Sequence, residues 1–396
     1  MRFIHTSDWH IGKGIRGKDR YDEARALLDE IATYSETESI DLVIIAGDLF
    51  DHPTPASEAE KVVYSFFSRM NRSSVPIVVI AGNHDSYERF DSRSDLFSIA
   101  NVNVFGTPRR NAVHSLVTKT GQKAIIGCLP YLSPRFLLKA NEIFELTEGE
   151  MKAGYSEKVG KAISILSRQF SPGAVNILVS HLFLQGAVPS STERRADTTD
   201  LYAVTAPAIP AGAQYCCLGH IHKQQRLERA SAPAYYCGSI MKLDFGEDLD
   251  EKGFLVVEAE AEKAARVEFI PLQQVVPVFT IEVEFSDLAN RAEEIRKAFA
   301  NSYGRIRIRH KQPIPNLSEI IKHEIPEAVA WDIVLPGSSD EKRTVEKVEL
   351  RQLMDPVEMF ATFCREEFDR EPSELHVQTM RRLYESALRE DHEEEQ

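Results

Sequence analysis

The sequence lacks any apolar run long enough to cross a membrane. None of its 396 residues lies in a stretch that approaches about 18 consecutive apolar side chains. The first ten residues, MRFIHTSDWH, turn polar too early for a secretory leader. Internal repeats and low-complexity segments are also missing. We therefore expect an intracellular, cytoplasmic protein with no membrane partner.

Cysteine is scarce and irregularly spaced. The five cysteines are odd in number and form no CxxC pair; they are Cys128, Cys216, Cys217, Cys237 and Cys364. This pattern excludes a disulfide framework and a zinc ribbon. We expect small buried side chains in a reducing compartment.

An excess of positive charge is missing too. Lys and Arg number 47 against 61 Asp and Glu, which gives a net charge of −14. A protein that coats nucleic acid unaided neutralises phosphates with Lys and Arg, so the balance argues against that class. Clefts depend on local charge, however, and a nucleic-acid site of limited extent stays open. The acidic residues 391–396 are expected to form a solvated tail.

Five short apolar runs stand out, and each ends in polar residues. They cover residues 1–10, 41–48, 75–85, 175–181 and 215–222. Runs rich in Val and Ile without alternation are typical of strands buried on both faces of a sheet. Helical patterns at 20–36, 56–70 and 156–170 separate several of them. This alternation predicts a layered α/β domain, in which ligands bind beyond the carboxyl ends of the strands.

The segment LGHIHK places two histidines, His220 and His222, directly after one of these runs. A polar turn is one explanation. The other is a shared site, because side chains two residues apart on a strand point the same way. The remaining runs favour the shared site, since their ends supply Asp8, His10, Asp48, Asn83, His84 and His181.

Each of these side chains alone is more often a cap or a hydrogen-bonded core residue. Together they form the donor set of a dinuclear metal centre. Imidazole and carboxylate suit divalent ions, and the lack of thiolate excludes a structural zinc site. Water shared by two cations has a lowered pKa, so we expect it to act as a hydroxide nucleophile near neutral pH.

The motifs D-x-H, GD-x-x-D, GNHD, H and GHxH occur in this order, and this set resembles the calcineurin-like metallophosphoesterases. The resemblance implies a layered metallophosphoesterase β-sandwich flanked by helices. It implies one metal held by Asp8, His10, Asp48 and His222. It implies a second held by Asp48 as the bridge, Asn83, His181 and His220. His84 then assists the leaving group as an acid, and Asp51 orients His84.

Longer segments narrow the resemblance. HTSDWHIGK, AGDLFDHPTPAS, AGNHDS, LPYLSPR, SHLFLQGA and YCGSIMKLDFGE, spread over most of residues 1–260, resemble the SbcD family of nuclease subunits from bacterial SbcCD DNA-repair complexes. The family implies two Mn²⁺ ions and cleavage of double-strand DNA ends (3′ to 5′) and of DNA hairpins. It also implies an ATPase partner, SbcC, a homodimer within a heterotetramer or larger complex, and work at the nucleoid. The role of His52 stays open.

Two other functions remain in view. A phosphatase or cyclic-nucleotide phosphodiesterase would keep the metals on the same scaffold. A catalytically silent scaffold would only bind DNA ends or a partner. The intact donor set, with His84 present, argues against the scaffold.

The pattern along the chain predicts five segments. They are a nuclease domain (1–275), a small α+β capping and DNA-binding domain (276–336), a linker (337–354), partner-binding helices (355–390) and the acidic tail (391–396).

Two basic groups are candidates for DNA contact. In GRIRIRHK, period two places Arg305, Arg307, Arg309 and Lys311 on one face of a strand. The alternative is an ordinary half-buried strand with a charged outer face. The second group, just after the first metal motif, is Lys13, Arg16, Lys18 and Arg20.

The two amphipathic helices predicted near the C-terminus have little of their own to pack against. Their apolar residues include Phe360, Phe363, Met380 and Leu383. Docking back onto the protein is one possibility. A groove on the SbcC subunit is the other, because amphipathic helices bind partners through such apolar faces.

Overall fold

The computed structural model describes residues 1–133, 154–190, 192–193, 198, 203–312, 314–334, 372–374 and 376–381. Contacts divide the chain into two units, residues 1–307 with 316–332 and residues 308–315 with 333–396. The first unit carries every predicted metal ligand. Predicted boundaries between the nuclease and capping domains stay predictions.

The first sheet contains three of the apolar runs predicted to be buried strands. Its order is β12-β11-β1-β2-β3-β4; β1 to β4 are parallel, and β11 pairs antiparallel with both β1 and β12. The strands are β1 (Arg2–Thr6), β2 (Leu42–Ile45), β3 (Ile77–Ile80), β4 (Val102–Phe105), β11 (Gly253–Glu258) and β12 (Arg266–Pro271). Every residue of β2 and β3 is buried, as expected of Val- and Ile-rich strands covered on both faces.

The second sheet contains the other two runs. Its order is β5-β6-β7-β8-β10-β9, with a parallel centre and antiparallel edges. The strands are β5 (Val113–Val117), β6 (Lys123–Leu129), β7 (Val175–His181), β8 (Tyr215–Gly219), β9 (Gln225–Arg226) and β10 (Ala234–Tyr236). β7 contacts β3, so the two sheets face each other across one continuous core.

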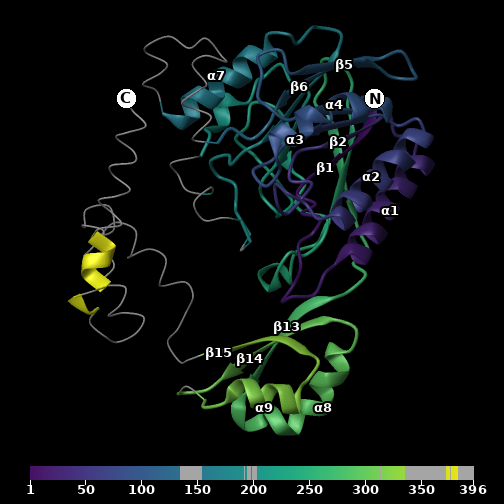
Figure 1. Ribbon diagram of the computed structural model, residues 1–396. Coiled ribbons are helices and arrows are strands. Elements are labelled where there is room, and N and C mark those ends of the chain that lie inside the picture. The colour runs from purple at the N-terminus through teal and green to yellow at the C-terminus, as the bar shows by residue number, and fades with distance from the viewer. Residues whose placement is uncertain are drawn as a thin grey trace. The chain divides into compact units, whose positions relative to one another are not determined.

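Helices complete the layers (Figure 1). They are α1 (Tyr21–Thr37), α2 (Ser57–Arg72), α3 (Tyr87–Ser92), α4 (Ser94–Ile99) and α7 (Tyr155–Ser167). α1 and α2 pack side by side, α3 and α4 pack on β4, and α7 packs on β6. The three predicted helices are thus confirmed as α1, α2 and α7, and so is the layered α/β class.

A small three-stranded sheet follows, in the order β13-β14-β15. Its elements are β13 (Val278–Glu284), α8 (Leu288–Phe299), β14 (Tyr303–Arg309), α9 (Leu317–Glu324) and β15 (Ala328–Val334). Ile306 and Ile308 of β14 are fully buried, which agrees with the predicted alternation. An apolar cluster joins Tyr303 of this sheet to Ile15 and Phe245.

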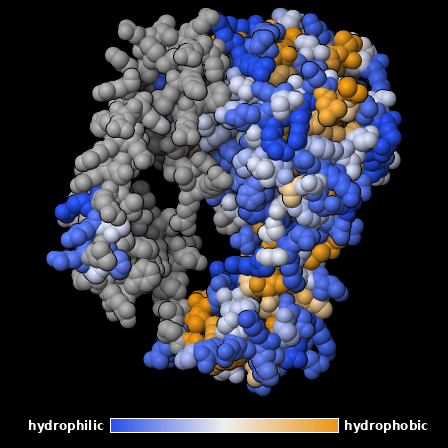
Figure 2. All heavy atoms as spheres, viewed as in Figure 1, coloured by the Kyte–Doolittle hydropathy of each residue, from blue (hydrophilic) through white to orange (hydrophobic). Residues whose placement is uncertain are grey.

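The cysteines and the surface agree with what the amino-acid composition predicts. The four described cysteines are buried free thiols. Within the described ranges, no helix combines the length and apolarity needed to cross a membrane. In the view of Figure 2 the coloured surface is mostly hydrophilic, with scattered hydrophobic areas. These features fit a core held together by apolar burial between two sheets.

Candidate metal centre

The predicted donors meet at the carboxyl ends of strands from both sheets. Each follows or ends a strand: β1 supplies Asp8 and His10, β2 Asp48, β3 Asn83 and His84, β7 His181, and β8 His220 and His222. All except Asn83 and His84 are at least 96% buried. The position agrees with the rule that ligands gather at this edge of parallel sheets.

The backbone here is held in unusual conformations. Asp8, His10, Asp48 and His220 all have positive φ, between 45° and 101°. Such angles are uncommon for residues with a side chain and cluster at functional sites. Gly82 allows the close approach, because a Cβ at that position would lie 2.1 Å from Asp48 Oδ1. The backbone conformation at these four residues therefore costs some stability, and it brings the donors together.

One group of donors centres on two facing imidazoles. His10 Nε2 lies 3.2 Å from His222 Nε2 and 3.5 Å from Asp48 Oδ2. Asp8, His10 and His222 each offer a donor atom, and these three atoms lie within 4.8 Å of one another. Nitrogen and oxygen donors at this spacing suit a divalent cation.

A second group centres on the amide of Asn83. Asn83 Oδ1 lies 2.9 Å from His181 Nε2 and 3.0 Å from His220 Nδ1. Asp48 Oδ2 lies 3.4 Å from the same His181 nitrogen. Asp48 therefore stands between the two groups, where a bridging carboxylate belongs.

The electrostatics fit positive charge in the centre. Burial alone raises the pKa of Asp48, but the imidazoles of His181 and His10 outweigh it and hold that pKa well below its usual value. Burial lowers the pKa of His181, and the Asp48 carboxylate more than offsets this, raising it to about 9. Burial raises the pKa of Asp8. Buried carboxylates need a counter-charge, which divalent cations would supply.

His84 contacts the main chain of Asp51. His84 Nδ1 donates to the main-chain carbonyl of Asp51 at 2.8 Å. The Asp51 carboxylate instead lies 3.4 Å from His10 Nδ1 and 3.4 Å from Lys13 Nζ. The main-chain carbonyl of Asp51 thus accepts from His84, and the Asp51 carboxylate faces the predicted ligand His10. The role of Asp51 in orienting His84 stays a prediction.

The part of the chain that carries this centre matches a known protein family. Residues 1–224 match the family model of the calcineurin-like phosphoesterases, which is more than half of the chain. The chain belongs to the calcineurin-like phosphoesterase family. At the level of this family, the predicted class of metal-dependent phosphoesterase is confirmed, and so is the fold.

Curated relatives of this phosphoesterase carry the name that the longer motifs suggested. This chain is 35% identical over 263 residues to the D subunit of the nuclease SbcCD from Bacillus subtilis, and the match covers 66% of each chain. It is 25% identical over 347 residues to the protein of the same name from Staphylococcus epidermidis, covering 87% of this chain and 89% of the relative. The resemblance to the SbcD family is therefore confirmed.

Solved structures include more distant likenesses. A dimetal phosphatase from Danio rerio matches 69% of this chain and 99% of its own, at 12% identity and a TM-score of 0.37. A likeness this weak adds nothing to the assignment.

The two predicted basic groups of the phosphoesterase have different surroundings. Lys13 and Arg16 line a cavity of about 330 Å³ together with His10, His84 and His222. Arg305 and Arg307 each lie within 4 Å of a carboxylate oxygen of Asp332. A role for Arg305, Arg307, Arg309 and Lys311 in holding DNA stays a prediction.

Of the predicted partner-binding residues, only Met380 is described, and it is half-buried. Phe360, Phe363 and Leu383 lie outside the described residues.

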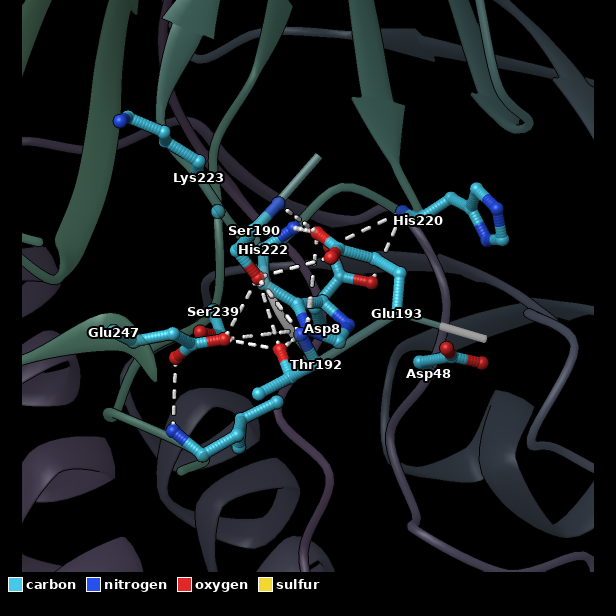
Figure 3. Close-up of polar contacts among 12 residues, drawn as sticks. Asp8, Asp48, Ser190, Thr192, Glu193, His220, His222, Lys223, Ser239 and Glu247 are labelled. Carbon is cyan, nitrogen blue, oxygen red and sulfur yellow. Dashed lines mark hydrogen bonds and ion pairs between the residues drawn. The ribbon is translucent and has the colours of Figure 1, made fainter. Parts of the chain in front are cut away.

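Sequence reasoning missed the residues that surround His222. Ser190, Thr192 and Glu193 approach it from one loop (Figure 3). Glu247 approaches from the short helix η3 (Phe245–Glu247), supported by Lys252. Burial raises the pKa of Glu247, but its bond to His222 and the charge of Lys252 outweigh this and lower it. The motif YCGSIMKLDFGE ends at Glu247, yet nothing in the pattern links it to a histidine 25 residues earlier.

Proposed function

We propose that this phosphoesterase is the nuclease subunit of an SbcCD-type complex. In this role it hydrolyses phosphodiester bonds at double-strand DNA ends, in the 3′ to 5′ direction, and opens DNA hairpins. The observation that carries the proposal is the buried convergence of His10, His222 and Asp48 beside a cavity lined by basic side chains. Relatives named as SbcCD nuclease subunits support DNA as the substrate.

The donors divide naturally between two cations. Asp8, His10, Asp48 and His222 would hold one, and Asp48, Asn83, His181 and His220 the other. Bound divalent cations in such a site lower the pKa of water and offset the charge of a phosphate. We propose Mn²⁺ for both, as the resemblance to the SbcD family implies; the nitrogen and oxygen donors by themselves would also accept Fe²⁺ or Zn²⁺.

His84 has the position of a proton donor. Its Nδ1 is committed to the Asp51 carbonyl, and its ring lines the same cavity as His10. In this role Nε2 would be the nitrogen that protonates the leaving oxygen or stabilises its charge. His84 packs edge-on against His10 at 4.7 Å between ring centroids, which fixes its place beside the donors.

The proposed partners follow from the family. We propose that the C-terminal helices bind the ATPase subunit SbcC, and that the chain forms a homodimer within a heterotetramer or larger assembly at the nucleoid. α4 supports self-association, because Leu96 and Ile99 on it are 65% and 78% exposed. Exposed apolar side chains of this size mark interaction surfaces when they lie together.

One assay separates this function from its alternatives. The purified chain is incubated with Mn²⁺ and three substrates: blunt duplex DNA, hairpin DNA and a chromogenic phosphodiester. We expect cleavage of all three, with the DNA substrates preferred. Cleavage of the small substrate alone would indicate a small-molecule phosphodiesterase, and cleavage of none would indicate a scaffold.

A further inference from the structure

The part of the centre around His222 contains a buried polar chain with a fixed direction. His222 Nε2 faces His10, and His222 Nδ1 points the other way, 2.6 Å from Thr192 Oγ1. The Thr192 hydroxyl is in turn bonded to Glu247 Oε1, and the same Oε1 lies 3.5 Å from His222 Nδ1 (Figure 3). Three side chains from three segments thus form one continuous hydrogen-bonded path away from the proposed metal.

Glu247 is held as an acceptor at the end of this path. Its second oxygen, Oε2, accepts from Lys252 Nζ at 2.9 Å and from the Leu243 main-chain nitrogen at 2.9 Å. The side chains of Glu247 and Lys252 are 0% and 1% exposed. A buried carboxylate paired with a lysine is ionised and has no proton to donate.

The direction of the path follows. Because Glu247 Oε1 can only accept, the Thr192 hydroxyl must donate to it. The lone pair of that hydroxyl is then turned toward His222, so Nδ1 must carry a proton and donate it. A neutral imidazole with its proton on Nδ1 has a free lone pair on Nε2, the atom that faces His10.

The same network fixes the backbone of His222. The main-chain nitrogen of His222 donates to Glu193 Oε1 at 2.8 Å, and its carbonyl accepts from Lys252 Nζ at 2.8 Å. Lys252 therefore holds both the histidine backbone and the carboxylate that sets its tautomer.

We propose that Glu247, acting through Thr192 and anchored by Lys252, is a positioning residue that selects the metal-binding tautomer of His222. The proposal rests on the proposed dinuclear site and names what prepares one of its ligands. Other ligands are set differently: His181 Nδ1 donates to the carbonyl of Ala46 at 2.8 Å, which no side-chain substitution removes. Among the described histidine ligands, His222 is the one whose Nδ1 reaches a carboxylate through a hydroxyl.

The test is Mn²⁺ binding by isothermal titration calorimetry, carried out on the full chain without substrate. Thr192→Val keeps the shape of the side chain but removes the hydroxyl. We expect this variant to lower the affinity for one of the two Mn²⁺ ions about 10- to 100-fold and to leave the affinity for the other unchanged. Thr192→Ser, which keeps the hydroxyl, should restore binding, and Glu247→Gln should weaken the same ion as Thr192→Val.

Glu23→Gln is the matched control. Glu23 is also a buried carboxylate in an ion pair, with Arg20 at 2.8 Å, but it takes no part in the centre. The Glu23→Gln variant should bind both ions as the wild type does. If Thr192→Val binds both ions with unchanged affinity, or Thr192→Ser is as weak as Thr192→Val, the proposal is wrong. A wild-type chain that does not bind two ions would instead contradict the proposed site itself.

Discussion

At the scale of single residues, His84 bonds through Nδ1 to the main-chain carbonyl of Asp51, and its ring lines the cavity beside the donors. We predict that His84→Gln lowers the rate of DNA cleavage by about 10²- to 10⁴-fold, the usual contribution of a proton donor. Mn²⁺ content, measured by elemental analysis, should stay at the wild-type level. His114→Gln, on the edge strand β5, controls for the loss of a histidine elsewhere. A His84 variant that loses metal would show that His84 is a ligand.

His5 gives a pH-dependent prediction away from the metals. It is fully buried in β1, and burial lowers its pKa from 6.5 to about 3. Below pH 6.5 the unfolded chain takes up a proton that the folded chain refuses, so acidification should reduce the free energy of unfolding. Protonation of His5 in the unfolded chain should lower the free energy of unfolding by about 1.4 kcal/mol for each pH unit, down to about pH 3.

The measurement is chemical unfolding of the metal-free wild type and of His5→Phe between pH 6 and pH 4. The wild type should lose more stability than the variant by about 1.4 kcal/mol for each pH unit. Parallel pH curves for the two proteins would show that His5 is not held neutral by the fold.

Some residues of the candidate site could be predicted from the sequence, and others could not. Asp8, His10, Asp48 and His181 were predictable, because each sits at the end of an apolar run and parallel strands end at one edge. Thr192 and Glu247 were not, because their contact with His222 depends on how separate loops pack and has no sequence period. The sequence predicts Asp51 near His84 but does not distinguish a carbonyl contact, which the structure has, from a carboxylate contact.

At the scale of elements, the loop after β1 is better placed than β14 to hold a phosphate. Lys13 and Arg16 line the cavity beside the donors, whereas the side chains of Arg305 and Arg307 are only 15% and 31% exposed. We predict that replacing Lys13 and Arg16 with Gln lowers the salt slope of duplex binding by about 0.9 for each phosphate that is no longer neutralised. Replacing Arg305 and Arg307 with Gln should change the slope less.

Binding is measured by fluorescence anisotropy in EDTA at several salt concentrations, so that cleavage does not interfere. If the β14 variant flattens the salt dependence more than the loop variant, the basic face of β14 holds the DNA, as the sequence suggested.

The elements themselves were predicted where burial leaves a strong pattern. The Val- and Ile-rich β2, β3 and β7 and the amphipathic α1, α2 and α7 were each visible in the sequence. β5 was not, because an edge strand such as Val113–Val117 is only partly buried and shows little contrast between its faces. The order of strands in the two sheets depends on contacts between distant segments, which no local pattern records.

At the scale of the whole molecule, the metal centre and the C-terminal segment should be separable. We predict that deleting residues 350–396 leaves a folded chain that still cleaves a small phosphodiester with Mn²⁺, because every proposed ligand lies before residue 223. The deletion should abolish co-purification with SbcC. Circular dichroism and a pull-down with tagged SbcC check both halves, and an unfolded truncated chain would mean that the helices pack on the protein's own core.

The central claim is that two cations share Asp48 at the ends of β1, β2, β3, β7 and β8. Its most direct test is the Mn²⁺ stoichiometry of the wild type and of Asp48→Asn, measured by calorimetric titration of the metal-free chain. The account predicts two ions per chain in the wild type, and weaker binding of both in the variant because the bridging charge is lost. One ion per chain, or a variant in which only one of two ions is weakened, would contradict it.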